Sequence, residues 1–400
     1  MTALISQSAG ILTAPRRTTD RIKRVCLVTE AAGGGVGRHF LDLAAGLAQR
    51  NIEVVAIYSP GRCDASFQQS QRNVGGVQFV ELPMRRAIHP LDAADLLKLT
   101  RCIRRHGPFD LIHCHSSKGG ALGRVAAALL RTPSIYTPHA LVTLDPTLSP
   151  LKRRMYGTIE RWLSRPSAAI IAVSPDEAEH AAQLGIAPQK IHVVLNGIDP
   201  PNFTTRESAR QQLGLRPDDF CIGFVGRLTA QKAPELLIAA LAELKQKHPS
   251  AVAVFVGSGP LENQLRKQID QLGLAQNVRL LGDTVATNIM PAFDVFCLPS
   301  RYEGLPYVLL EALAAGLPIV ARRVGGVAAC IDHDRNGLIV ENESSSDLAA
   351  ALHRLASDVS LRGEFATRSA IKAAALSVNR MIDDTLSVYE SVVTHPAGRR

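Results

Sequence analysis

Short apolar runs rich in β-branched residues recur along the chain, and each is followed by a turn and then by a stretch with helical periodicity. In the first half, the predicted strands are RVCLVT, EVVAIY, DLIHCH, PSIYT, AAIIAV and IHVVLN. Helices are predicted between them near residues 37–49, 117–130, 147–165 and 175–184. Strands that alternate with helices favour a parallel sheet with right-handed crossovers.

The alternation is interrupted at residues 196–218, a segment with two adjacent prolines, turn formers and charges. It resumes with the predicted strands CIGFVG, AVAVFVG, VRLLG, DVFCLP, LPIVA and GLIV. Helices are predicted near residues 233–247, 259–272 and 307–315, and almost throughout residues 345–395. The pattern therefore indicates a second unit built like the first.

We predict two Rossmann-like domains, residues 23–200 and 201–378, with a helix at about 379–395 that crosses back onto the first domain. Residues 1–22 lack the long apolar core of a secretory signal and are predicted to be a flexible tail. A chain of 400 residues exceeds one ordinary core. The content of 46% hydrophobic and only 4% aromatic residues suits the α/β class. Ligands of such sheets bind beyond the carboxyl ends of the strands, so we expect a ligand-binding cleft between the domains.

Charge is distributed unevenly between the two halves. The net charge is +9; residues 1–200 hold 24 Lys and Arg against 15 Asp and Glu, whereas residues 201–400 hold 21 of each kind. The basic half predicts an anionic partner such as a phospholipid, a lipid diphosphate or a nucleic acid, although solubility alone explains it equally well.

The cysteine and hydropathy patterns bear on the compartment. The seven cysteines are scattered and form no CxxC pair, which indicates reduced core residues in a cytoplasmic setting rather than disulfides or a zinc site. No apolar run approaches the roughly 18 residues that span a bilayer.

The segment from Arg301 to Val320 carries the strongest chemical signal. Its sequence predicts a strand, a loop, a short helix and Gly316 just after the helix. Glu303 falls in the loop and Glu311 on the helix. Free amides at the helix start can meet an anion or sugar hydroxyls, and a carboxylate one turn further can accept both hydroxyls of a ribose.

Two further segments follow predicted strands directly. Gly226-Arg227-Leu-Thr-Ala-Gln-Lys232 offers two cations, and Gly257-Ser-Gly259-Pro260 lets the backbone approach a ligand closely. Cleavage of a bond to a nucleoside diphosphate builds charge on the departing phosphate, so fixed cations aimed there lower the barrier. Arg227 and Lys232 are candidates for this role without a metal.

Together these segments resemble the retaining family-4 glycosyltransferases, which have the GT-B fold. Glu303 and Glu311 are similar to the E-x7-E signature of that family. The other landmarks occur in the family order over about residues 24–345 and are Ser174-Pro175, Asn196-Gly197-Ile198-Asp199, Gly226-Arg227-x4-Lys232, Gly257-x-Gly259-Pro260, Glu303-Gly304, Gly316-x-Pro318 and Gly325-Gly326.

The resemblance implies a role for each matching residue of the second domain. Arg227 and Lys232 would hold the donor diphosphate, and Glu311 would hold the ribose. Gly259 would lie close to the donor. The transferred sugar would face Glu303 and the amides around Gly304 and Leu305.

In the first domain the resemblance implies roles for two segments. Gly34 and Gly35, with Arg38 as a further candidate, would lie near the donor phosphate and the acceptor, and His139 would face the sugar. The stretch AAGGGVGRH has more glycines than is usual in the family, so which glycine meets the ligand stays open. Retention of configuration is also implied, with attack on the face of departure and no covalent nucleophile.

Each residue also has a purely structural interpretation. Glu303 and Glu311 could be a solvated pair, Arg227 and Lys232 members of surface salt bridges, and His139 a buried core histidine. His113 and His115 lack further ligands at metal-binding spacing and are interpreted as structural or supporting residues, so no metal is expected. The GGGVG stretch does not meet G-x-G-x-x-G, which argues against an oxidoreductase.

Residues 151–165 combine five cations with apolar residues at helical spacing. Such a helix can lie on an anionic membrane, and it can equally pack an apolar stripe on the sheet. With the basic first half, this pattern makes a lipid-linked acceptor and peripheral contact with the inner membrane face reasonable expectations, and no nucleic acid is expected.

The predicted function is transfer of a sugar from a nucleoside-diphosphate sugar to a hydroxyl acceptor, with a role in polysaccharide assembly. Three alternatives remain open: a sugar-nucleotide epimerase on the same plan, a glycosidase that uses Glu303 and Glu311, and a non-catalytic protein that binds nucleotide or lipid.

Overall fold

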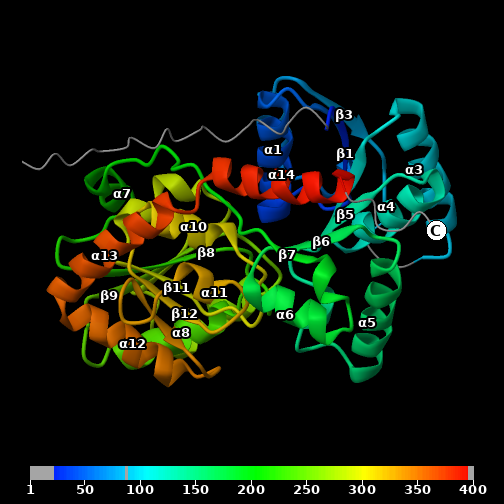
Figure 1. Cartoon of the computed structure of the whole chain (residues 1–400). Coiled ribbons are helices and arrows are strands. Elements are labelled where there is room, and N and C mark those ends of the chain that lie inside the picture. The colour runs from blue at the N-terminus through cyan, green and yellow to red at the C-terminus, as the bar shows by residue number, and fades with distance from the viewer. Residues whose placement is uncertain (1–21, 86–88, 395–400) are drawn as a thin grey trace, which may run out of the picture.

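The computed structural model describes residues 22–85 and 89–394 and contains two parallel sheets (Figure 1). The first sheet has seven strands in the order β3-β2-β1-β4-β5-β6-β7, and the second has six in the order β10-β9-β8-β11-β12-β13. Every strand pair in both sheets is parallel. The predicted class, two Rossmann-like α/β domains, is confirmed.

The elements of the first domain alternate as the sequence pattern indicates. They are β1 (Arg24–Thr29), α1 (Gly34–Gln49), β2 (Glu53–Tyr58), α2 (Ala65–Gln71), β3 (Val77–Glu81), α3 (Asp92–His106), β4 (Leu111–His115), α4 (Ser117–Leu130), β5 (Ser134–Thr137), η3 (Val142–Leu144), α5 (Pro150–Ser164), β6 (Ala169–Ala172), α6 (Pro175–Gln183) and β7 (Ile191–Val193).

The second domain repeats the alternation and is followed by a run of helices. Its elements are α7 (Arg206–Gln212), β8 (Phe220–Val225), α8 (Pro234–Leu244), β9 (Ala251–Val256), α9 (Glu262–Gln271), β10 (Val278–Leu280), β11 (Val295–Leu298), α10 (Tyr307–Ala314), β12 (Ile319–Arg322), α11 (Val327–Cys330), β13 (Gly337–Val340), α12 (Ser345–Ser357), α13 (Val359–Ala374) and α14 (Val378–Thr394).

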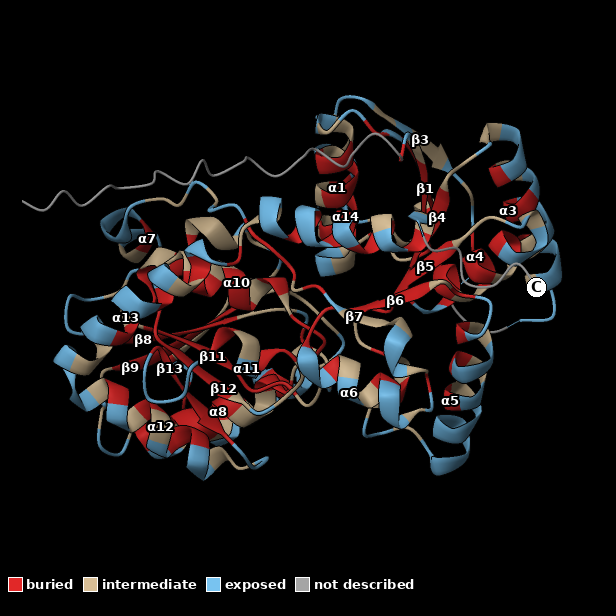
Figure 2. Ribbon diagram, viewed as in Figure 1, coloured by how far each residue is buried: buried red, intermediate tan, exposed pale blue. Residues whose placement is uncertain are grey.

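The central strands of each sheet are buried on both faces by helices, as Figure 2 shows. Strand β1 is almost wholly buried, and β9 is wholly so. Strands covered on both faces read as continuous apolar runs rather than as alternating ones, which is why RVCLVT and AVAVFV were recognisable as strands. Each sheet therefore has an apolar layer on either side, and each domain has its own core.

Helix α14 leaves the second domain and packs beside α1 of the first (Figure 1). A Cβ on Gly46 of α1 would lie 1.9 Å from Cδ1 of Ile382, so the glycine lets the two helices meet. The hydroxyl of Tyr389 lies 2.6 Å from Nδ1 of His113 on β4. The chain thus crosses between the domains twice, and the Ile198 amide donates to the Leu376 carbonyl where the two crossings run side by side.

Several predicted boundaries differ from the structure. β3, α2 and α3 were not predicted, and α7 lies inside the segment expected to be irregular. β3 is a half-exposed edge strand without a continuous apolar run. The helix predicted over 147–165 begins at Pro150, where Ser149 caps it. The helical stretch 345–395 is three helices, and Asp358 caps the second by accepting a hydrogen bond from the Leu361 amide.

The tail predicted for residues 1–22 lies outside the described residues, except for Ile22. That residue is buried in the first core and so does not belong to a flexible tail. In the described part of the chain, no helix is both long and apolar enough to cross a bilayer.

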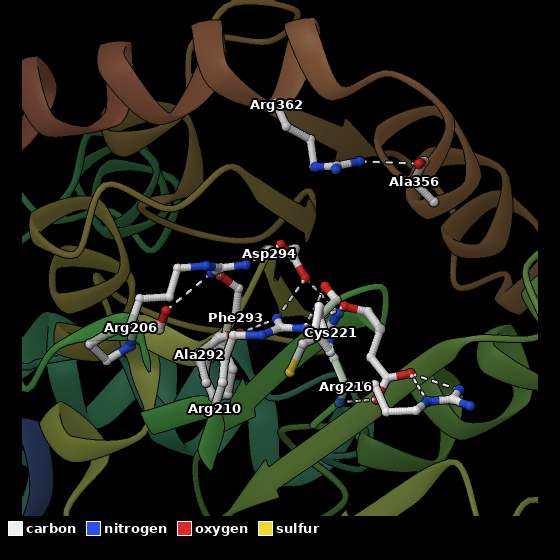
Figure 3. A network of polar contacts seen from close by, with 12 residues as sticks. Arg206, Arg210, Arg216, Cys221, Ala292, Phe293, Asp294, Ala356 and Arg362 are labelled. Atoms are coloured by element: carbon white, nitrogen blue, oxygen red, sulfur yellow. Dashed lines mark hydrogen bonds and ion pairs between the residues drawn. The ribbon is translucent and has the colours of Figure 1, made fainter. Parts of the chain in front are cut away.

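A polar network secures the amino end of β8, opposite the end that leads into Gly226 and Arg227 (Figure 3). Asp294 accepts hydrogen bonds from the Cys221 amide and from Arg206, at 2.8 and 2.6 Å. Arg210 lies 3.4 Å from the same carboxylate. These contacts bind α7, β8 and the start of β11 together. They fix the position of β8 relative to β11, and with it the relative position of the carboxyl ends of the two strands.

Candidate functional site

The loop after β8 is fastened to two neighbouring loops. Leu228 donates its amide hydrogen to the Ser258 carbonyl at 2.9 Å, and Gln231 accepts from the Arg301 amide at 2.8 Å. A Cβ on Gly259 would lie 2.4 Å from the Leu228 carbonyl oxygen, so only glycine fits there. The three segments singled out in the second domain therefore form one surface at the carboxyl ends of β8, β9 and β11.

Lys232 and Glu303 meet on this surface. The Nζ atom of Lys232 lies 2.6 Å from Oε1 of Glu303, and both side chains are largely buried. Glu303 follows β11 and Lys232 follows β8, so the adjacency of these strands brings the pair together. The structure thus places a cation and a carboxylate of the predicted site in direct contact.

Arg227 lies on the same loop but is exposed, and its side chain makes no hydrogen bond or ion pair with another described residue. Its charge acts to lower the pKa of Tyr302, which burial and Asp145 raise to about 12. The Tyr302 hydroxyl donates to Asp145 of the first domain at 3.3 Å. Arg227 is therefore available to an anion beside the Lys232–Glu303 pair.

The loop between β11 and α10 presses against the first domain. A Cβ on Gly304 would lie 2.9 Å from the Ala140 nitrogen, and one on Gly325 would lie 2.4 Å from the Glu303 carbonyl oxygen. The amide hydrogens of Gly304 and Leu305 meet no acceptor among the described residues. Two backbone donors are thus free next to Glu303.

Glu311 lies on α10 and contacts the first domain instead of Lys232. Its Oε1 atom is 2.8 Å from Nη1 of Arg38. Burial raises the pKa of Glu311, and the adjacent Arg38 works against that rise. Arg38 also lies 3.6 Å from Asp42, whose pKa burial raises to about 6. Glu311 and Arg38, both predicted site residues, are therefore partners.

The glycine loop begins α1. Gly34 has φ +57°, and its amide donates to Asp64 at 2.7 Å. A Cβ on Gly34 would meet no atom within 4 Å, whereas one on Gly35 would lie 3.2 Å from the Tyr307 ring of α10. Gly35 is thus where the loop touches the second domain, and Gly34 borders open space.

His139 lies in a strained turn after β5. His139 and Ala140 have φ values of +58° and +82°, a left-handed conformation that non-glycine residues adopt at a cost. Glu177 holds the turn, since its carboxylate accepts hydrogen bonds from the amides of Ala140, Leu141 and Val173 at 2.8 to 3.0 Å. Glu177, from α6, was not predicted.

His139 forms a cluster with two other histidines, His39 and His115. His115 Nδ1 lies 3.1 Å from His139 Nε2, and the His39 ring centroid lies 4.6 Å from that of His139. Burial lowers the pKa of all three, that of His39 to about 4, so the cluster is neutral near pH 7. Nitrogens of the three lie within 4.8 Å of one another, which would suit a metal, although no ion is needed to explain the packing.

Asn196 couples this cluster to the donor loop. Its Nδ2 donates to the Leu305 carbonyl at 2.8 Å, so its Oδ1 accepts the hydrogen of His39 Nδ1 at 3.0 Å. His113 is fully buried and forms hydrogen bonds with Tyr389 and Thr137. The Nε2 atom of His115 has no hydrogen-bond partner in the described part of the chain.

The predicted residues thus form two groups along the boundary between the domains. Arg227, Lys232, Glu303, Gly304 and Leu305 form one, and Arg38, Gly35 and Glu311 form the other. Sequence reasoning missed His39 and Asn196 as members of the site; the family landmark Asn196-Gly197-Ile198-Asp199 was the signal that could have found Asn196.

Two family models match the chain. The model described as Glycosyltransferase Family 4 matches residues 33–201, and the model described as Glycosyl transferases group 1 matches residues 205–372. Their border falls between β7 and α7.

Curated relatives carry glycosyltransferase names. A D-inositol 3-phosphate glycosyltransferase of Jonesia denitrificans is 31% identical over 315 residues, which is 73% of this chain and 74% of the relative. A UDP-Gal:alpha-D-GlcNAc-diphosphoundecaprenol alpha-1,3-galactosyltransferase of Escherichia coli is 30% identical over 277 residues, which is 67% of this chain and 71% of the relative.

Solved structures share the fold. Anabaena Alr3699/HepE in complex with UDP and glucose superposes with a TM-score of 0.77 at 23% identity, covering 92% of this chain and 100% of the neighbour. The lipopolysaccharide glycosyltransferase WaaG superposes with a TM-score of 0.71 at 20% identity, covering 94% and 100%.

Proposed function

The chain belongs to glycosyltransferase family 4 and has the GT-B fold, and from this premise we propose that it moves a sugar, with retention of configuration, from a nucleoside-diphosphate sugar to a hydroxyl acceptor. That the protein is a glycosyltransferase follows from the family. The donor class, the stereochemistry and the acceptor are the proposal.

The observation that carries the proposal is the contact of Lys232 with Glu303. A lysine ammonium bound to a carboxylate at the carboxyl ends of β8 and β11 is a cation that a donor diphosphate can engage. As the glycosidic bond breaks, negative charge grows on the departing diphosphate. Lys232 and the exposed Arg227 would stabilise that charge from fixed positions, so the reaction requires no metal.

The remaining donor contacts follow from the free groups around that pair. The amides of Gly304 and Leu305 and the carboxylate of Glu303 would bind hydroxyls of the transferred sugar, while Gly259 lets the backbone approach the donor. Glu311 would accept the two ribose hydroxyls. Because Arg38 forms an ion pair with Glu311, donor binding would rearrange this contact.

His139 would face the sugar from the first domain, and Gly34 and Gly35 would border the donor phosphate and the acceptor. Burial holds the histidine neutral, so it would serve as a hydrogen-bonding partner rather than as a fixed charge. Retention would proceed by attack on the same face from which the diphosphate departs, with no covalent intermediate on the protein.

We further propose that the acceptor is a lipid-linked glycan of a polysaccharide pathway, met at the cytoplasmic face of a membrane. Three observations support this setting: the basic excess of the first half, seven free cysteines, and a curated relative whose name specifies a diphosphoundecaprenol acceptor. The contact would be peripheral and would use α5.

The test is turnover with a panel of nucleoside-diphosphate sugars, with and without acceptor extracts. We expect product only when both substrates are present, with the anomeric configuration of the donor kept. Conversion of the donor without acceptor would indicate an epimerase, and cleavage of plain glycosides would indicate a glycosidase. Nucleotide binding without turnover on any donor would contradict the proposal.

A further inference from the structure

A hollow of about 410 Å³ lies between α5 and α6, on the first domain. Three arginines of α5 line it: Arg153, Arg154 and Arg161. They recur at helical spacing and so lie along one side of the helix. Gln183 and Leu184, at the end of α6, form the opposite wall. The donor site does not include this hollow.

The positive charge of the hollow is not neutralised within the described residues. None of the three arginines has a carboxylate within ion-pair distance there. Glu160, the one acid on α5, points into the protein and pairs with Arg124 at 2.8 Å. Arg153 donates to the backbone carbonyl of Asp145 at 2.9 Å, which fixes one guanidinium. Guanidinium groups arranged in this way match the oxygens of a phosphate group.

An apolar stripe runs beside the arginines on the same helix. Leu151, Met155 and Trp162 are 78%, 43% and 61% exposed, although residues of this type are usually covered. Their spacing puts them on one outward face, adjacent to the face of the arginines. The inner face, with Glu160 and Ser164, is buried against the domain. Helix α5 therefore presents a phosphate-binding side next to an exposed hydrocarbon-binding side.

From this juxtaposition we propose that the hollow binds the phosphate headgroup of an anionic membrane lipid while Leu151, Met155 and Trp162 enter the acyl boundary. A helix with cations on one side and apolar residues beside them lies in the plane of a membrane interface. The inference deepens the membrane setting of the proposed function, on which it rests.

Docking through α5 would bring the donor site close to the bilayer. Arg153 of the hollow binds the Asp145 carbonyl, and the Asp145 carboxylate accepts a hydrogen bond from Tyr302, the neighbour of Glu303. The boundary between the domains would then open beside the membrane surface, within reach of an acceptor carried on a lipid.

Trp162 makes the proposal directly measurable, because it is the one tryptophan of the chain. Its fluorescence is recorded on the full chain with vesicles of phosphatidylglycerol and phosphatidylcholine, and with vesicles of phosphatidylcholine alone. We expect a shift of emission to shorter wavelength only with the anionic vesicles. An absent shift, or an equal shift with both kinds of vesicle, overturns the proposal.

A triple variant separates the hollow from general attraction. A cation near an anionic surface contributes about fivefold in affinity, so Arg153→Gln, Arg154→Gln and Arg161→Gln together should weaken vesicle binding roughly a hundredfold. The matched control removes the same charge from α3, by Arg101→Gln, Arg104→Gln and Arg105→Gln, all exposed. We expect a loss below about threefold there. Equal losses in the α5 and α3 variants would show that vesicle binding depends on the overall positive charge and not on the hollow, and would overturn the proposal.

Two further arms complete the test. Inorganic phosphate, at a fixed ionic strength, should not reverse vesicle binding. Full reversal would show that the hollow is a site for free phosphate, and the proposal of a lipid headgroup would be wrong. Stabilisation by nucleoside-diphosphate sugars should be unchanged in the α5 variant, which shows that it is folded. If vesicle binding fails while donor binding and transfer persist, this inference is wrong and the proposed donor chemistry stands.

Discussion

Arg38 and Glu311 join the two domains directly: Nη1 and Oε1 are 2.8 Å apart, although the two residues are 273 positions apart in the chain. The Glu311 carboxylate is also the proposed binder of the donor ribose. Arg38 and the ribose hydroxyls therefore compete for the same carboxylate. This relation ties donor binding to the geometry of the domain boundary.

Replacing Glu311 by glutamine keeps the size of the side chain and removes its charge. A hydrogen bond to a charged group contributes about 1.5–3 kcal/mol, so the KM for the donor should rise about 10- to 100-fold. Glu364→Gln, at an exposed position of α13, is the control and should match the wild type. An unchanged KM for Glu311→Gln would exclude a role in donor binding.

Lys232→Ala should lower kcat about 100- to 1,000-fold, because removal of one fixed electrostatic group at a site of developing charge has that effect. It also leaves Glu303 without its partner, so the melting temperature should be recorded. Lys267→Ala, at an exposed position of α9, removes a lysine away from the donor loops and should keep full activity. Wild-type kcat in a folded Lys232→Ala protein contradicts the mechanism.

The Lys232–Glu303 contact could not be read from the sequence. Each residue follows a recognisable strand and matches a family landmark, so each was predicted as a site residue. Their pairing depends on β8 and β11 lying next to each other, which is a property of the sheet order and not of either segment. The pairing of Arg38 with Glu311 is likewise a tertiary contact.

The fold was more predictable than the site, for a physical reason. β1 and β9 are covered on both faces and therefore carry unbroken apolar runs, whereas the edge strand β3 is half-exposed and carries no such run. α3, which was missed, has a polar and strongly charged sequence. His39 was missed because its place beside His139 depends on the packing of α1 against the ends of β4 and β5.

The buried histidines predict sensitivity to acid. The pKa of His39 falls from 6.5 to about 4 on burial, so between these pH values the unfolded chain binds a proton that the folded chain does not. The free energy of unfolding should therefore decrease as the pH is lowered from 6.5 to 4, by up to about 3 kcal/mol for this residue.

Denaturant titrations of wild type and His39→Gln from pH 7 to 4 measure this contribution. Asp42, whose raised pKa acts in the opposite direction, is present in both proteins and cancels in the difference. The variant should lose less stability on acidification than the wild type. Parallel curves would show that His39 titrates normally when folded.

Gly304→Ala should disturb the contact between the domains. The new Cβ would lie 2.9 Å from the Ala140 nitrogen, closer than real Cβ contacts allow, so the donor loop or the His139 turn must shift. We expect at least a tenfold loss of kcat/KM, because small displacements of positioned groups cost about 100-fold in rate. Gly363→Ala, where a Cβ meets no atom within 4 Å, should keep activity and slightly strengthen α13. Equal activity of the two variants would place Gly304 outside the reacting geometry.

The most direct test of the account is the thermal stabilisation of wild type, Lys232→Ala and Glu311→Ala by a panel of nucleoside-diphosphate sugars. A ligand that binds only the folded state adds about 2.7 kcal/mol at a concentration 100 times its Kd. We expect at least one donor to raise the Tm of the wild type and both variants to lose most of this rise. A rise of the same size in all three proteins would show that neither side chain holds the donor.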